Sequence, residues 1–210
     1  MLPRWFKPLC WVLCLAPLAP IFLMVVGLFI PTGPDTVTGW MLALPNSVNP
    51  IESMIRHLGD WALRFILLTL CLTPLRRLTG WAGWIKIRRL IGLFAFFYVS
   101  LHLLSYIVLD QFFDWAAIGH DIIKHPFITV GMLAFILLIP LAATSTQAAM
   151  KRLGRRWKQI HQLIYLIAPL GVLHFWWMVK ADIREPAVYL IVLALLLGIR
   201  LWWRVSSSRK

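Results

Sequence analysis

The sequence predicts an all-α polytopic membrane protein, a six-helix transmembrane bundle forming one domain over residues 1–210. The chain is 60% hydrophobic and only 14% charged, which is too apolar for a soluble domain. It also contains six apolar stretches long enough to cross a bilayer. These stretches are predicted to be helices because a backbone in hydrocarbon must satisfy its amides within its own segment.

The predicted spans follow one another with short loops between most of them. The first resembles a secretory signal, but its apolar run is long for a cleaved one, so we expect it to remain as a span. The second is preceded by a helix start, with Asn49 as N-cap, Pro50 at the first helical position and Glu52 at the third. The six predicted spans are residues 9–30, 58–75, 90–109, 126–144, 160–179 and 187–203.

Charge is distributed unevenly between the two sides of this topology. One side carries sixteen basic residues and no acidic ones, whereas the other carries all eight acidic residues. The positive-inside rule therefore places both termini in the cytoplasm of a multi-pass protein of the bacterial inner membrane. The net charge of +13 follows from this topology, so we expect contact with membrane lipid and no nucleic-acid partner.

The chain shows no internal repeat and no Gly-rich dinucleotide fingerprint, and no segment has room for a separate nucleotide-binding domain. Such a chain cannot collect hydride from NAD(P)H by itself. The three cysteines all lie in apolar spans, where we interpret them as small apolar fillers.

Two histidines lie inside separate predicted spans. His102 is twelve residues into the third span, about 18 Å from its inner end, and His174 is fourteen residues into the fifth, about 21 Å. Ionisable groups at this depth are costly and suggest a function. Two imidazoles that face each other across a helix bundle are typical of axial heme ligands, so we predict that this pair binds heme iron. The alternative is that each histidine is a hydrogen-bonded packing residue.

His161 begins the fifth span near the inner surface, roughly 20 Å from His174. It is a candidate for a second heme or another inner-side site, or else an ordinary interfacial residue. Thirteen residues at about 100° each put the two rings on different faces of one helix, so a kink is needed to aim both inward. Pro169 and Gly171 are the predicted kink.

Three basic residues are candidates for contact with a heme propionate, because a carboxylate near the membrane surface needs a cationic partner. They are Arg64, Arg56 and Lys180. The alternative for Arg64 is an ion pair with Asp60, one helical turn earlier.

Four segments taken in order resemble one known family: NPIESMIRHLGDWALRF, RRLIGLFAFFYVSLHLLSY, TSTQAAMKRLGRRWKQIHQLIY and GVLHFWW. The chain is similar to the MsrQ (YedZ) family, the heme-binding membrane subunits of bacterial protein-methionine-sulfoxide reductases. That family belongs to the ferric-reductase-like transmembrane group. The similarity covers nearly the whole chain.

The resemblance implies a b-type heme subunit that takes electrons from the quinol pool. It would pass these electrons to a periplasmic molybdopterin-containing catalytic subunit, with which it forms a heterodimer. The catalytic subunit would repair oxidised proteins. FMN is also associated with the family. His102, His161 and His174 match the family's heme-associated histidines, whereas Arg88 and Arg89 stand where an inner-level histidine of the third span would lie. A second heme would then need His161 with another partner such as Arg89, so the resemblance leaves one heme or two.

The resulting expectation is an electron-transfer subunit of an oxidoreductase complex, with the reduction of methionine sulfoxide in the partner. Three other functions stay open at this stage. The chain could be a stand-alone ferric or heme reductase, a small transporter or proton channel that uses the buried histidines as a relay, or a structural scaffold.

Overall fold

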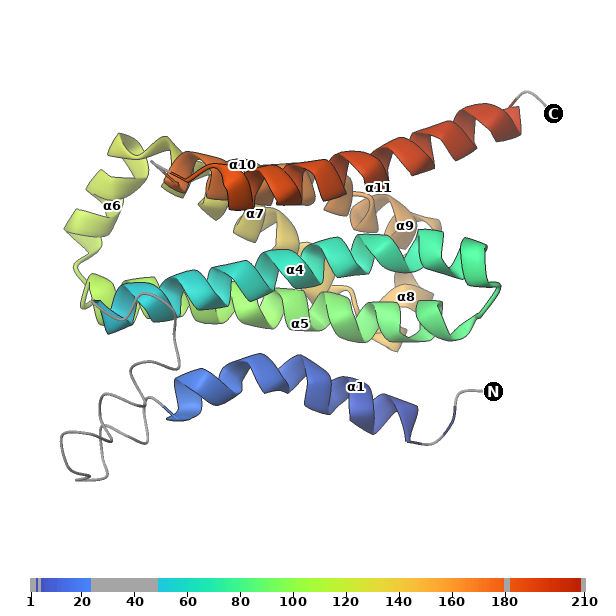
Figure 1. Cartoon of the computed structure of the whole chain (residues 1–210), viewed down its shortest axis with the longest axis horizontal. Coiled ribbons are helices and arrows are strands. Elements are labelled where there is room, and N and C mark those ends of the chain that lie inside the picture. The colour runs from blue at the N-terminus through green and yellow to red at the C-terminus, as the bar shows by residue number, and fades with distance from the viewer. Residues whose placement is uncertain (1–2, 4, 24–48, 180–181, 209–210) are drawn as a thin grey trace.

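Long helices run roughly along one axis in the computed structural model (Figure 1). The structure describes residues 3, 5–23, 49–179 and 182–208, and no strand occurs among them. Six helical segments of this described part are long and apolar enough to cross a membrane. The prediction of an all-α, multi-pass membrane protein is thereby confirmed, although residues 24–30 of the first predicted span lie outside the described residues.

Each predicted span corresponds to one or two of these helices. The helices, with short 3₁₀ and π segments called η, are α1 (Phe6–Leu15), η1 (Ala16–Leu18), α4 (Pro50–Thr79), α5 (Gly83–Ser105), η2 (Tyr106–Asp110), α6 (Trp115–Lys124), α7 (Pro126–Ala143), α8 (Gln147–Leu153), α9 (Arg155–His161), α10 (Ile164–Met178) and α11 (Arg184–Ser208).

Helix α4 starts where its capping residues predict. The Asn49 side chain accepts a hydrogen bond from the Glu52 backbone N–H at 3.3 Å, and Pro50 occupies the first turn. The helix therefore begins eight residues before the predicted span, because a capped polar turn precedes its apolar run. It ends at Thr79, and the following Gly80 has a φ of 70°, a left-handed conformation that glycine adopts without strain.

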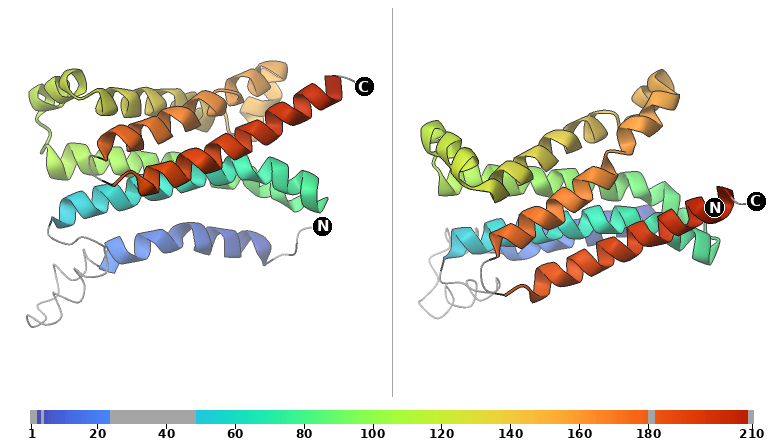
Figure 2. Two further views of the ribbon diagram at one scale, coloured as in Figure 1. Left: turned by 45° about the horizontal axis from the view of Figure 1, so that its top comes forward. Right: turned by 90° about the horizontal axis from the view of Figure 1, so that it is seen from above.

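Two helix pairs form the core of the bundle. Helix α4 packs along α5, and α7 packs along α10 (Figures 1 and 2). Helix α11 lies against both α4 and α10, while α1 lies on the outside of α5. The core is therefore a four-helix arrangement with one further helix on each side.

Two side chains of the core bind the carbonyl groups of α1 and η1. The Tyr98 hydroxyl, fully buried on α5, donates to the Cys14 carbonyl at 2.9 Å. A ring nitrogen of His57 on α4 lies 2.8 Å from the Pro17 carbonyl. Because apolar contact between helices gives little preference in a lipid environment, these polar contacts fix where the first helix sits.

A third polar contact attaches α11 to α4. Pro74 lies inside α4 and has no N–H, so it leaves the carbonyl of Leu70, four residues earlier, without its usual helical donor. The Arg200 side chain on α11 donates to that carbonyl, and its guanidinium lies over the Tyr165 ring, 5.4 Å from the centroid. An arginine thus replaces the missing backbone donor.

The basic segments gather at one end of the bundle. The turn between α4 and α5 lies at the same end as α8 and α9, which follow α7 (Figure 1). The Phe6 end of α1 and the Ser208 end of α11 also lie there, whereas α6 lies at the opposite end. This arrangement agrees with the sequence, in which the termini and every second loop carry the basic residues.

We predict that Arg200→Met lowers the free energy of unfolding by about 1–3 kcal/mol, because it leaves the buried Leu70 carbonyl unpaired. Adding Pro74→Ala supplies a backbone donor for the same carbonyl and should recover part of the loss. Thermal unfolding in detergent measures both changes, with Arg204→Met, one turn along α11 and exposed, as the control. Strictly additive effects of the two substitutions would contradict this role for Arg200.

Candidate functional site

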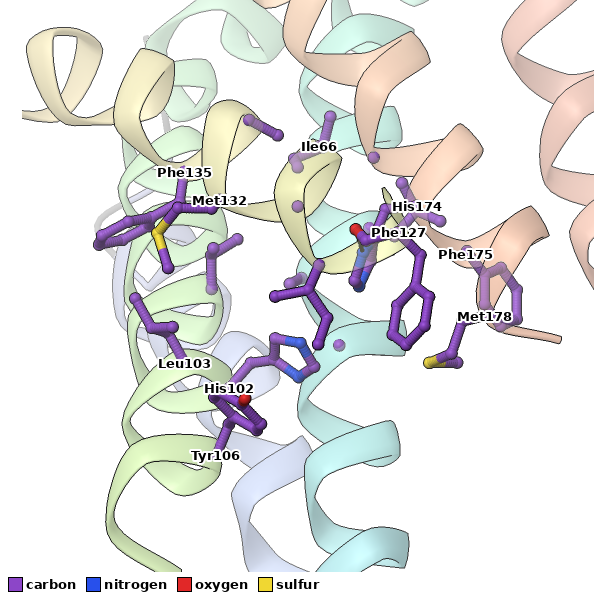
Figure 3. A pocket seen from close by; sticks show the side chains of 18 of the residues that line it. Ile66, His102, Leu103, Tyr106, Phe127, Met132, Phe135, His174, Phe175 and Met178 are labelled. Atoms are coloured by element: carbon purple, nitrogen blue, oxygen red, sulfur yellow. Dashed lines mark hydrogen bonds between the residues drawn. The ribbon is translucent and has the colours of Figure 1, made fainter. Parts of the chain in front are cut away.

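His102 on α5 and His174 on α10 meet in the core of the bundle. Their ring centroids lie 6.2 Å apart, and the ring planes are nearly perpendicular at 81°. Both rings line a cavity of about 220 Å³ between the two helix pairs (Figure 3). Two residues that are 72 positions apart in the chain therefore share one site.

Each ring is held by a backbone carbonyl of the neighbouring helix. His102 Nδ1 donates to the Ile55 carbonyl on α4 at 2.8 Å, and His174 Nδ1 donates to the Phe127 carbonyl on α7 at 2.7 Å. A carbonyl oxygen only accepts, so the proton is on Nδ1 in both rings and Nε2 keeps its lone pair. In the described part of the chain no hydrogen bond involves either Nε2. This is the arrangement of a histidine prepared to bind a metal.

The surroundings do not supply the rest of a coordination sphere. No group of three or more His, Cys, Asp or Glu side chains able to hold a metal ion occurs among the described residues. The cavity lining is almost entirely apolar. Two nitrogen donors in an apolar cavity suit a planar cofactor that carries its own equatorial ligands better than they suit a bare ion.

The cavity is lined by pairs of residues at one fixed sequence spacing, which corrects the expectation that the chain has no internal repeat. His174, Gly131 and Phe127 follow His102, Gly59 and Ile55 by the same 72 positions, since 174 − 102, 131 − 59 and 127 − 55 are equal. Every residue that lines the cavity, except Ile167, has a counterpart 72 positions away that also lines it. The α4–α5 and α7–α10 pairs thus contribute equivalent halves of one site.

The two halves differ in polarity. Arg56, Asp60 and Tyr106 line the α4–α5 half, and their counterparts in the other half are Ile128, Met132 and Met178. The Arg56 guanidinium also pairs with Glu52 at 2.6 Å. The Tyr106 hydroxyl donates to Asp121 of α6 at 2.9 Å. A cofactor with one polar edge would therefore meet polar side chains on one half only.

Comparison with known proteins identifies the family. Residues 58–172 match the family model described as ferric reductase like transmembrane component. A protein-methionine-sulfoxide reductase heme-binding subunit MsrQ from Rhodospirillum rubrum is 57% identical over 162 residues, which cover 77% of this chain and 78% of that protein. The MsrQ protein of Xanthomonas campestris pv. campestris (strain 8004) is 55% identical over 161 residues, which cover 77% of this chain and 74% of that protein.

The chain belongs to the MsrQ family. The resemblance expected from the four sequence segments is thereby confirmed. The segment matched as ferric reductase like contains His102 and His161 and ends two residues before His174. It covers α5 and α7 completely and most of α4 and α10.

His161 lies away from the His102–His174 pair. It is the last residue of α9, its ring stacks on Trp157 with centroids 4.0 Å apart, and its Nδ1 donates to the Trp157 carbonyl at 3.1 Å. The helix is interrupted at Gln162 and Leu163, and α10 begins at Ile164. Pro169 and Gly171, where we predicted the kink, both lie inside α10, so the interruption at Gln162 and Leu163 is an additional break between His161 and His174.

Among the described residues, Arg89 forms no hydrogen bond, ion pair or ring contact with His161. Arg89 is exposed on α5, whereas the adjacent Arg88 is half-buried, with Nη1 3.5 Å from the Thr73 hydroxyl. An inner site that uses both residues therefore stays a prediction.

The three candidates for a propionate contact have different positions. Arg56 lines the cavity. Arg64 points instead toward α11, where its Nε donates to the Tyr189 hydroxyl at 2.9 Å. Its guanidinium carbon also lies 4.8 Å from the ring centroid of Trp61, which is on α4 itself. Lys180 lies outside the described residues. The alternative ion pair of Arg64 with Asp60 does not form in the described part of the chain.

Sequence reasoning missed two glycines, Gly59 on α4 and Gly131 on α7. Each lies directly beside one histidine ring. The signal that identifies them is the equal spacing of 43 residues, since 102 − 59 and 174 − 131 are the same. A search for glycine and histidine together at a fixed offset would have found both.

Proposed function

We propose that this chain is the membrane electron-transfer subunit of a methionine-sulfoxide-reducing system and that His102 and His174 bind one heme iron from opposite sides. The observation that carries the proposal is a pair of imidazoles that line one cavity, each with Nδ1 bound to a carbonyl and with no hydrogen bond at Nε2 among the described residues. The relatives' name, heme-binding subunit, points to the same cofactor.

The separation of the rings supports this ligand pair. Two imidazoles on one metal hold their ring centroids about 6 Å apart, since each metal–nitrogen bond is about 2 Å long and each ring adds about 1 Å. The observed separation is 6.2 Å. The sequence contains no C-x-x-C-H motif, which argues against covalently attached heme of the c type. The b type is part of the proposal and rests on membership of the MsrQ family.

Bound heme supplies one-electron redox chemistry that no side chain of the chain offers. The residues of the chain have simpler tasks. His102 and His174 would hold the iron, and the carbonyls of Ile55 and Phe127 keep both rings in the tautomer that binds metal. The apolar lining would exclude water, and Arg56 would provide a cation for a propionate at the polar half of the cavity.

Electrons reach this site from the inner side and leave on the outer side. We assign both termini and the basic segments to the cytoplasmic side of the bacterial inner membrane by the positive-inside rule. Quinol is the proposed donor, with FMN as an additional carrier, and a periplasmic molybdopterin-containing methionine-sulfoxide reductase is the proposed acceptor in a heterodimer. Those identities rest on membership of the MsrQ family.

We predict that His102→Ala and His174→Ala each lose most of the bound heme while the protein still inserts and folds, because one axial nitrogen is removed. Heme per protein, measured from the pyridine hemochrome spectrum of the purified protein, tests this. The matched control is His120→Ala, which removes an exposed histidine of α6.

Full heme content in both variants would reject the axial assignment. A wild-type protein without any Soret band would reject the electron-transfer function and favour a transporter or proton channel. Reduction of iron chelates by a protein that shows no activity with a methionine-sulfoxide-reducing partner would instead indicate a stand-alone ferric reductase.

His161 is too far from His174 to bind the same iron, since thirteen residues span roughly 20 Å of helix. We propose that it serves electron input at the inner side. His161→Ala should keep the heme bound by His102 and His174 and slow its reduction by a quinol analogue. Stopped-flow absorption measures that rate, and a wild-type rate in the variant would exclude this role.

A further inference from the structure

Each histidine ring packs directly against a glycine of the adjacent helix. A Cβ atom at Gly131 would lie 2.7 Å from His174 Nδ1 and 2.9 Å from its Cε1. A Cβ at Gly59 would lie 3.1 Å from both Nδ1 and Cε1 of His102. The first spacing is too short for real atoms, and the second requires the ring to shift by a few tenths of an ångström. Any side chain at either position therefore displaces the ring.

The same two glycines lie one helical turn after the carbonyls that bind the rings. In an α-helix the N–H of residue i bonds the carbonyl of residue i−4, so Gly59 and Gly131 share their acceptors, Ile55 and Phe127, with the histidines. Each histidine ring therefore passes over the glycine to reach the carbonyl one turn earlier. Because glycine has no Cβ, it leaves room for the ring at both sites.

The structure thus holds each ring by a hydrogen bond on one edge and by close packing on the other. The resulting angle between the ring planes is 81°. At this angle the π orbitals of the two imidazoles would act on different d orbitals of a shared iron, and those d orbitals would be nearly equal in energy. A low-spin ferric heme with such ligands gives an EPR signal with an unusually large maximum g value.

We propose that Gly59 and Gly131 are positioning residues, which set the orientation of the two imidazoles and keep their Nδ1–H groups on the backbone carbonyls. The inference rests on the proposed binding of heme iron by His102 and His174. Its consequence is that the glycines control the redox potential of the heme. A hydrogen bond from Nδ1 makes the imidazole a stronger donor and favours ferric iron, so weakening that bond raises the midpoint potential.

The two sites should differ in sensitivity. Gly131→Ala must move the His174 ring, so we expect the apparent heme affinity to fall about 10-fold or more, as for other changes behind a metal ligand. Gly59→Ala needs only a small shift of the His102 ring. We expect it to keep its heme, with a smaller maximum g value and a higher midpoint potential than the wild type.

The experiment compares the purified heme-containing protein with Gly131→Ala and Gly59→Ala. It records heme per protein, the low-temperature EPR spectrum and the midpoint potential. Gly198→Ala on α11 is the control, because a Cβ there meets no atom within 4 Å. All three changes replace glycine by alanine in a helix, which favours helix formation, so a loss of helix propensity cannot explain a difference between them.

A shifted g value or potential in Gly59→Ala, with Gly198→Ala unchanged, supports the proposal. Wild-type values of both in Gly59→Ala overturn it, even if Gly131→Ala fails to fold. Reduced thermal stability without any change in the spectrum or potential also overturns it, because glycine would then serve helix packing alone. A wild-type protein without a low-spin heme signal is a different outcome, since it rejects the proposed function itself.

Discussion

Two hydrogen bonds between a histidine ring and a helix carbonyl determine how this bundle builds its site. The bonds from His102 to Ile55 and from His174 to Phe127 are 2.8 and 2.7 Å long. A polar ring buried in an apolar bundle is costly unless it is hydrogen-bonded, and each ring meets that requirement with Nδ1 alone. Within the described residues Nε2 therefore forms no hydrogen bond in either ring, and both rings line the cavity. The hydrogen bond that lowers the cost of burying each ring also leaves Nε2 available as a ligand atom.

The rest of the fold keeps these two bonds in place by the same means. Helices in lipid gain little from apolar contact with each other, so polar contacts have a large share in fixing their positions. Tyr98 and His57 hold the first helix by its carbonyls, and Arg200 binds the carbonyl that Pro74 leaves free. Each of these contacts joins a side chain to a backbone oxygen. The positions of the helices are thus specified by side-chain contacts to buried backbone carbonyls as well as by apolar packing.

Much of this could be predicted from the sequence, because the signals are local. Hydropathy predicted the six spans, the cap at Asn49 predicted the start of α4, and counting residues placed His102 and His174 at similar depth. Contacts between distant segments were not predictable in this way. Arg64 binds Tyr189, 125 positions along the chain, instead of the nearby Asp60. The glycines beside the histidines escaped notice because their importance depends on which helix face meets which ring.

The central claim is that both imidazoles bind the same iron atom. X-ray absorption at the iron K-edge of the purified wild-type protein tests it directly, because scattering from rigid imidazole rings can be counted for each iron. We expect six nitrogen neighbours with the outer-shell scattering of two imidazoles. A spectrum with one imidazole or none would contradict the claim.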